Sequence, residues 1–86
     1  MNTIATIETA KGLLRYKLFS TKSDNNIHYG ITVNSRLFGD ETATISEIST
    51  DETFVSRLMN MLADNMVLPS TFREVVEEYV AAVMTV

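Results

Sequence analysis

The fold of this chain is decided by residues 49–83, which read STDETFVSRLMNMLADNMVLPSTFREVVEEYVAAV. Apolar residues recur there at steps of three and four, a spacing typical of amphipathic helices. The pattern breaks once, where Asn65 predicts a left-handed helix end and Pro69 suits the first turn of a second helix. The stretch therefore predicts two helices whose short connection makes them antiparallel neighbours.

Polar residues mark the start of each predicted helix. Ser49 and Glu52 fit a capping box, in which the serine caps the helix and the glutamate reaches back to it. Thr50 or Asp51 could cap the helix instead, because each also has a side-chain oxygen near the boundary. Residues 71–74, from threonine to glutamate, fit a second capping box.

Each predicted helix carries an apolar stripe, and short isolated helices are marginal in water, so both stripes need a surface to cover. The first stripe contains Phe54, Val55, Leu58, Met59, Met61 and Leu62, and the second contains Phe72, Val75, Val76, Tyr79, Val80 and Val83. The apolar end of the chain, Val83 to Val86, either extends the second helix or makes a further contact.

The first half of the chain supplies that surface. Residues 3–9, 13–21, 27–33 and 42–48 are rich in alternating and β-branched side chains and are joined by short turns, which predicts an antiparallel meander. One sheet face would carry Leu14, Tyr16, Leu18, Ile27, Tyr29, Ile31, Val33, Ala43 and Ile45. The sequence thus predicts an α+β fold of one domain, residues 1–86, with a four-stranded antiparallel β-meander (1–48) followed by a two-helix hairpin (49–86) packed on one sheet face.

Three more specific predictions concern residues within the strands. Ile4 and Ile7 would point to opposite faces of a regular strand, so the first strand should contain a bulge or lie at an edge. Gly30 interrupts the cleanest alternation and should admit a neighbour's large side chain. Strict alternation places Ile48 on the outward face, opposite to Ile45.

The charge of the chain is unevenly distributed. The net charge is −4, and all of it falls in residues 49–86, which carry two arginines against six carboxylates. Such a helical surface repels nucleic acid and anionic membranes. The chain has no cysteine and no apolar run long enough for a membrane span, and residues 1–6 do not resemble a signal peptide, so we expect a cytoplasmic protein.

The outward sheet face is the candidate interaction face. It would carry Leu13, Arg15, Lys17, Phe19 and His28. The mixture of apolar and basic groups leaves three readings open: contact with a protein partner, self-association into a homodimer, or a platform for single-stranded nucleic acid. We expect protein contact first and nucleic acid as the alternative.

Catalytic and metal-binding patterns are weak in this sequence. His28 is the one histidine, and its outward position leaves it without a second ligand. Glu74, Glu77 and Glu78 cluster on one side of the second helix, but away from its apolar stripe they should be solvated. We therefore expect no catalysis, no bound metal and no cofactor. An enzyme that uses His28 with carboxylates is the third-ranked hypothesis.

Several short apolar runs resemble those of a known family. They are Tyr29-Gly30-Ile31, Ile45 to Ser49, Val67-Leu68-Pro69 opening a helix, and Val75 to Val80 within it. The pattern is similar to a family of small proteins of unknown function from spore-forming Gram-positive bacteria. The resemblance implies a fold and a lineage, and it implies no catalytic residue.

Overall fold

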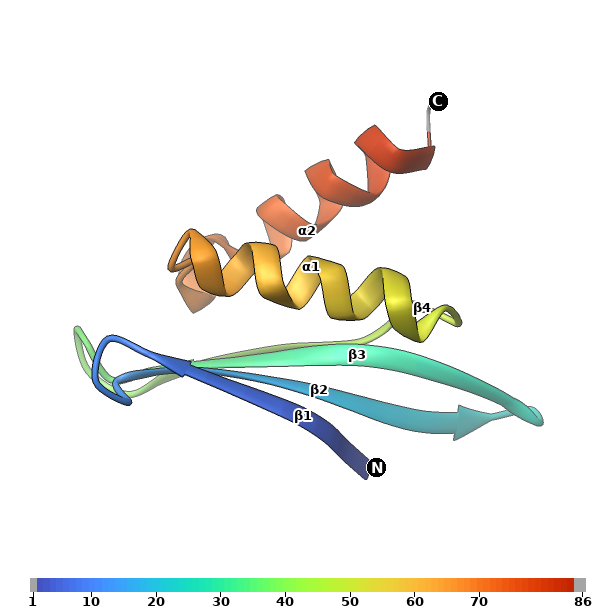
Figure 1. The fold of residues 1–86 in the computed structure, drawn as a ribbon, viewed down its shortest axis with the longest axis horizontal. Helices are drawn as coiled ribbons and strands as arrows, with labels where there is room; N and C mark the ends of the chain where they lie inside the picture. Colours follow the sequence, from blue (N-terminus) through green and yellow to red (C-terminus); the bar gives the residue numbers. More distant parts are fainter. Residues whose placement is uncertain (1, 85–86) are drawn as a thin grey trace.

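The structure is a computed structural model that describes residues 2–84, and it shows one open antiparallel sheet followed by two helices (Figure 1). The strands are β1 (Asn2–Thr9), β2 (Leu14–Ser23), β3 (Asn26–Ser35) and β4 (Glu41–Ser49), in that order across the sheet. The helices are α1 (Glu52–Asp64) and α2 (Pro69–Met84), and both lie on the same side of the sheet. The predicted α+β fold is confirmed. Thr85 and Val86, part of the predicted apolar end, lie outside the described residues.

The core forms between the helices and the predicted face of the sheet. The alternation in β2 and β3 therefore selects the correct face. Ile27 is the exception, being half exposed, because it follows the β2–β3 turn at a tip that extends beyond α1 (Figure 1). The buried apolar side chains of this core are Leu14, Tyr16, Leu18, Ile31, Val33, Val55, Leu58, Met59, Leu62, Ala63, Val67, Phe72 and Val76.

Tyr16 places one polar atom inside this core. Its side chain is 0% exposed, and its hydroxyl donates a hydrogen bond of 2.8 Å to the carbonyl oxygen of Val67. Burial raises the pKa of the Tyr16 hydroxyl to about 12, because the phenolate would lose its hydration. The bond ties the centre of the sheet to the connection between α1 and α2.

That connection is closed by hydrogen bonds that end α1. The left-handed residue is Met66 (φ 50°), whereas Asn65 has φ −98°, so the prediction of a left-handed Asn65 is wrong by one position. The Met66 N–H donates to the Ala63 carbonyl at 3.1 Å, and the Val67 N–H donates to the Leu62 carbonyl at 3.0 Å. This pair of bonds is a Schellman motif, which fixes the direction in which the chain leaves the helix.

Asp51, the alternative cap, begins α1. Its Oδ1 accepts from the backbone N–H groups of Thr53 at 3.0 Å and Phe54 at 3.3 Å. The Ser49 hydroxyl oxygen instead accepts from the Asp51 N–H at 3.0 Å, so the Ser49–Glu52 capping box is wrong. Asp51 is the cap because its carboxylate accepts hydrogen bonds from two backbone N–H groups that have no partner within the helix. Its negative charge is also favourable at the positive end of the helix dipole.

The second helix begins at Pro69, as predicted. Thr71 lies inside the first turn, where its N–H donates to the Leu68 carbonyl at 3.1 Å. The predicted capping box at residues 71–74 is therefore wrong. Proline at the first helical position needs no partner for an N–H group, so the helix starts two residues earlier than the threonine.

The predicted irregularity of β1 is also present. Its register against β2 shifts between Thr3 and Ala5, so Ile4 occupies a β-bulge, and β1 is an edge strand. Beyond the bulge, Ile7 pairs with Tyr16 and packs against the core. Ile4 itself is 42% exposed, so of the two isoleucines only Ile7 contributes to the core.

A larger irregularity lies between β3 and β4. Tyr29 pairs with Ser49, but Ile31 pairs with Ile45, so β4 contains a bulge between these pairs. The bulge breaks the alternation that the sequence predicts. Ile48 consequently packs against the core on the helix side, and its predicted outward position is wrong.

Gly30 faces this bulge. A Cβ atom there would collide with the carbonyl oxygen of Ile45 and would lie 2.7 Å from the Cα of Ser46. The missing side chain thus admits the backbone of β4, whereas the prediction was a neighbour's side chain. The bulged backbone of β4 can approach β3 this closely only because residue 30 is a glycine.

Replacing Gly30 by alanine should therefore destabilise the domain. Backbone atoms cannot rotate away as side chains do, so β3 and β4 must separate, at a cost of about 1–3 kcal/mol. Urea unfolding measures this difference. Thr32→Ala, two residues further along the same strand, is the control and should cost about 1 kcal/mol or less. Equal losses in both variants would contradict the close approach at Gly30.

Replacing Tyr16 by phenylalanine should lower the free energy of unfolding by about 1–3 kcal/mol, because the Val67 carbonyl then loses its side-chain donor. Urea unfolding at pH 7 measures the loss. A second readout is pH. Because the folded pKa is raised to about 12, the unfolded tyrosine ionises first, and stability falls between pH 10 and 12. This fall should be smaller in Tyr16→Phe than in the parent, and an identical fall would contradict the assignment.

Candidate functional site

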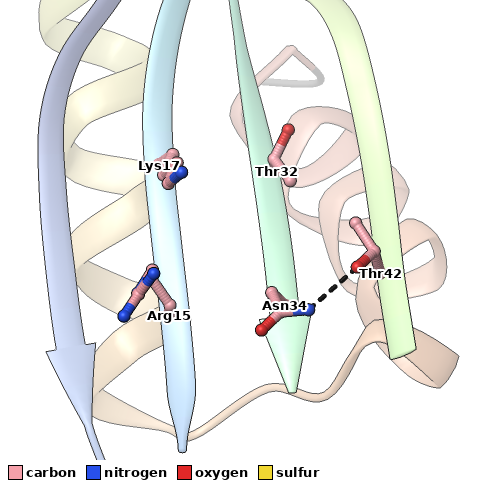
Figure 2. Close-up of a pocket in the computed structure, with 5 residues that line it drawn as sticks. All are labelled: Arg15, Lys17, Thr32, Asn34 and Thr42. Atoms are coloured by element: carbon pink, nitrogen blue, oxygen red, sulfur yellow. Dashed lines mark hydrogen bonds between the residues drawn. The ribbon is translucent and has the colours of Figure 1, made fainter. Parts of the chain in front are cut away.

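The sheet face away from the helices carries a shallow polar hollow. Figure 2 shows Arg15 and Lys17 on β2 beside Thr32 and Asn34 on β3 and Thr42 on β4, with the helices behind the sheet. The hollow has a volume of about 230 Å³. Its side chains come from alternate strand positions, so the pleat alone brings them together.

Asn34 organises one end of this face. Its side-chain amide nitrogen donates to Asp40 Oδ1 at 2.9 Å, to the Glu41 carbonyl at 3.2 Å and to Thr42 Oγ1 at 2.9 Å (Figure 2 marks the last of these). The amide has only two N–H groups for these three acceptors, so its donors are fully used within the domain. Asn34 therefore stabilises the β3–β4 turn.

The two cations of this face differ in their surroundings. The Arg15 guanidinium lies 3.1 Å from the Glu8 carboxylate, and both side chains are about half exposed. Such an exposed pair contributes little to stability, but it neutralises the arginine locally. Lys17 forms no ion pair with any residue from 2 to 84. The positive charge that this face can offer a ligand is therefore small.

The structure separates the predicted interaction residues. Arg15 and Lys17 lie together on the outer face, whereas Leu13 lies in the turn before β2 and His28 is partly buried. Phe19 is 2% exposed, so the expectation of an exposed aromatic ring is wrong. Phe19 is paired across the sheet with Thr3 on β1 and with Gly30 on β3.

A second surface, which the sequence did not predict, lies between β4 and α2. We call it the β4–α2 groove. It consists of a hollow of about 340 Å³ and a neighbouring one of about 250 Å³ that share Ile48 and Val80. The first is lined by Ile45, Glu47, Ile48, Arg73, Val76, Glu77, Val80 and Ala81, and the second by Ile48, Ser49, Asp51, Phe54, Val80 and Val83.

The groove exists because α2 leaves the sheet along its length. In Figure 1 the C-terminal half of α2 rises away, whereas α1 lies along the sheet. Exposure along the apolar stripe rises accordingly, from 0% at Phe72 and 4% at Val76 to 46% at Val83, with Val80 intermediate. The apolar stripe therefore continues beyond the surface that could cover it.

The periodicity of the sequence predicts that this whole stripe, from Phe72 to Val83, is covered by the sheet. A clue was available, because α2 has 16 residues and α1 has 13, so the longer helix overhangs its neighbour. The other half of the groove depends on the β4 bulge, which turns Ile48 toward the helix side. The alternation pattern contains no trace of that bulge.

Charged side chains surround the apolar floor of the groove. Glu47, Glu77 and Asp51 contribute carboxylates and Arg73 contributes one guanidinium, and all four residues are exposed. No ion pair involving these groups is formed among the described residues. The groove therefore has an apolar floor and a mainly acidic rim.

Residues 2–84 contain neither a metal-binding cluster of side chains nor a membrane-spanning helix. From residue 2 to residue 84, no group of three or more histidine, aspartate or glutamate side chains is placed to hold a metal ion. No helix in this part of the chain is long and apolar enough to cross a membrane. Every buried side-chain nitrogen or oxygen of these residues has a hydrogen-bond partner.

Comparison with known proteins gives a family and no activity. No curated protein and no solved structure matches the chain. The model of a family of unknown function, DUF6514, matches residues 1–82, which is nearly the whole chain. The predicted resemblance to a family of unknown function is thereby confirmed. The chain belongs to the DUF6514 family.

Proposed function

We propose that this domain is a non-enzymatic protein-binding module and that it binds its partner in the β4–α2 groove. The observation that carries the proposal is the rising exposure of the α2 stripe, from the buried Phe72 to the half-exposed Val83. Continuous apolar surface with a polar rim is typical of protein interaction sites. Ile45 and Ile48 widen that surface from the β4 side.

The outer sheet face is the weaker candidate for the binding surface. Its side chains are mainly polar, and several of their hydrogen bonds are made within the domain, including a 3.0 Å contact between the hydroxyls of Thr32 and Thr44. Burial of Phe19 removes the aromatic ring on which a nucleic-acid platform or an apolar dimer contact would depend. Nucleic-acid binding through Arg15 and Lys17 remains the alternative.

Two expectations from the sequence accompany this proposal. The absence of cysteine from the sequence supports a cytoplasmic location. The short apolar runs that resemble proteins of spore-forming Gram-positive bacteria support an origin in that lineage. Both stay predictions.

An affinity capture with matched variants tests the proposal. The purified domain, Val83→Asp and Thr42→Asp are immobilised separately and exposed to extract from the source organism. Val83 lines the groove and is already 46% exposed, so a charge there should block the groove without unfolding the domain. Thr42 lies in the polar hollow of the outer face and receives the same charge. Circular dichroism checks the fold of each variant.

The expected result is a protein that the parent and Thr42→Asp retain and that Val83→Asp loses. Isothermal titration of the purified partner against the three forms then confirms direct binding. Retention that is lost only with Thr42→Asp would move the function to the outer face. Retained nucleic acid with a steep salt dependence would instead support the alternative.

A further inference from the structure

We propose that the partner of the β4–α2 groove is a cationic amphipathic protein segment, in which apolar side chains are interspersed with lysine or arginine. This inference rests on the proposed function and names the chemistry of the partner. The apolar part of the segment would cover Ile45, Ile48, Val76 and Val80. The basic part would meet the carboxylates of the rim.

The rim supports this choice through its unpaired charges. Glu47 projects from β4 and Glu77 from α2, so the two carboxylates come from opposite walls of the same hollow. Neither takes part in an ion pair among residues 2–84. Arg73 is the single cation that lines the groove. A basic partner would therefore gain ion pairs at this rim without breaking existing ones.

The net charge around the groove also favours a cationic partner. Residues 49–86 carry the entire net charge of −4, and Glu74 and Glu78 lie on α2 beside the groove-lining positions. This field attracts a cationic segment and accelerates its association. It repels anionic lipid, and a second copy of the same acidic surface would bring like charges together.

The dimensions of the groove fit a short segment. The lining positions on α2 run from Arg73 to Val83, ten residues apart, which corresponds to about 15 Å of helix. An extended peptide covers that length with about five residues. A linear segment is therefore enough to fill the groove, and a folded partner domain would need to contribute only that part of its surface.

Fluorescence anisotropy with two synthetic peptides tests the inference. In one labelled peptide leucine alternates with lysine, and in the other leucine alternates with glutamate. The parent domain should bind the lysine peptide at least about tenfold more tightly, and added salt should reduce the difference. In Glu47→Lys/Glu77→Lys the preference should reverse, because the rim then carries three cations against the Asp51 carboxylate.

A matched variant separates the rim from the general field. Glu74→Lys/Glu78→Lys makes the same change in net charge on the same helix, at positions that do not line the groove. This variant should keep the preference for the lysine peptide, although with weaker affinity. A reversal as large as that of the rim variant would overturn the inference. It would show that the overall charge of the domain, and not the rim of the groove, selects the peptide.

The remaining outcomes distinguish failure of the inference from failure of the proposed function. If both peptides bind equally and Val83→Asp removes both, the groove binds without selecting charge, and only the inference fails. If neither peptide binds, the inference also fails. If Val83→Asp leaves peptide binding unchanged, the groove is not the binding surface, and both fail. A dimer in light scattering that Val83→Asp splits into folded monomers would assign the groove to a second copy and overturn the inference.

Discussion

The hydrogen bond from Tyr16 to the Val67 carbonyl is the constraint on which the arrangement of the helices depends. A hydroxyl buried at the centre of an apolar sheet must find a partner inside the protein. The carbonyl that accepts it belongs to the connection between α1 and α2. The backbone N–H of Val67 also donates a hydrogen bond to the carbonyl oxygen of Leu62, near the end of α1. Val67 is therefore held to both the sheet and α1, and α2 starts from a fixed point two residues later.

That fixed start gives α2 its exposed end. Phe72 and Val76, close to the anchor, are buried against the sheet and α1, and burial falls with each further turn. The opposite wall of the groove has an independent origin in the β4 bulge. Gly30 admits the backbone of that bulge, and the bulge brings Ile48 to the helix side. Gly30 on β3 and Tyr16 on β2 thus jointly determine the shape of the β4–α2 groove, although neither residue lines it.

The periodicity of the sequence predicted the elements, their order and the covered sheet face, because these depend on local patterns of apolar residues. The errors have other causes, which differ from one to the next. Asp51 rather than Ser49 caps α1, since neighbouring polar residues compete for the same N–H groups. Phe19 is buried between Thr3 of β1 and Gly30 of β3, and this cross-strand register is a long-range property that alternation within one strand does not predict. The sequence did not predict the groove, because periodicity shows which residues share a helix face but not how much of that face the sheet covers.

The two surfaces of the domain differ in how completely their polar groups are satisfied. On the outer face, the Asn34 side-chain N–H groups are hydrogen-bonded within the β3–β4 turn, and Arg15 is paired with Glu8. A ligand there would have to compete with these existing contacts. In the groove, Glu47 and Glu77 flank apolar side chains and have no ion-pair partner among the described residues. A partner of the proposed kind would add contacts there rather than replace existing ones. This asymmetry adds to the exposed α2 stripe as support for the proposed site on the helix side, and it follows from the β4 bulge and the course of α2, which the alternation of the strands does not predict.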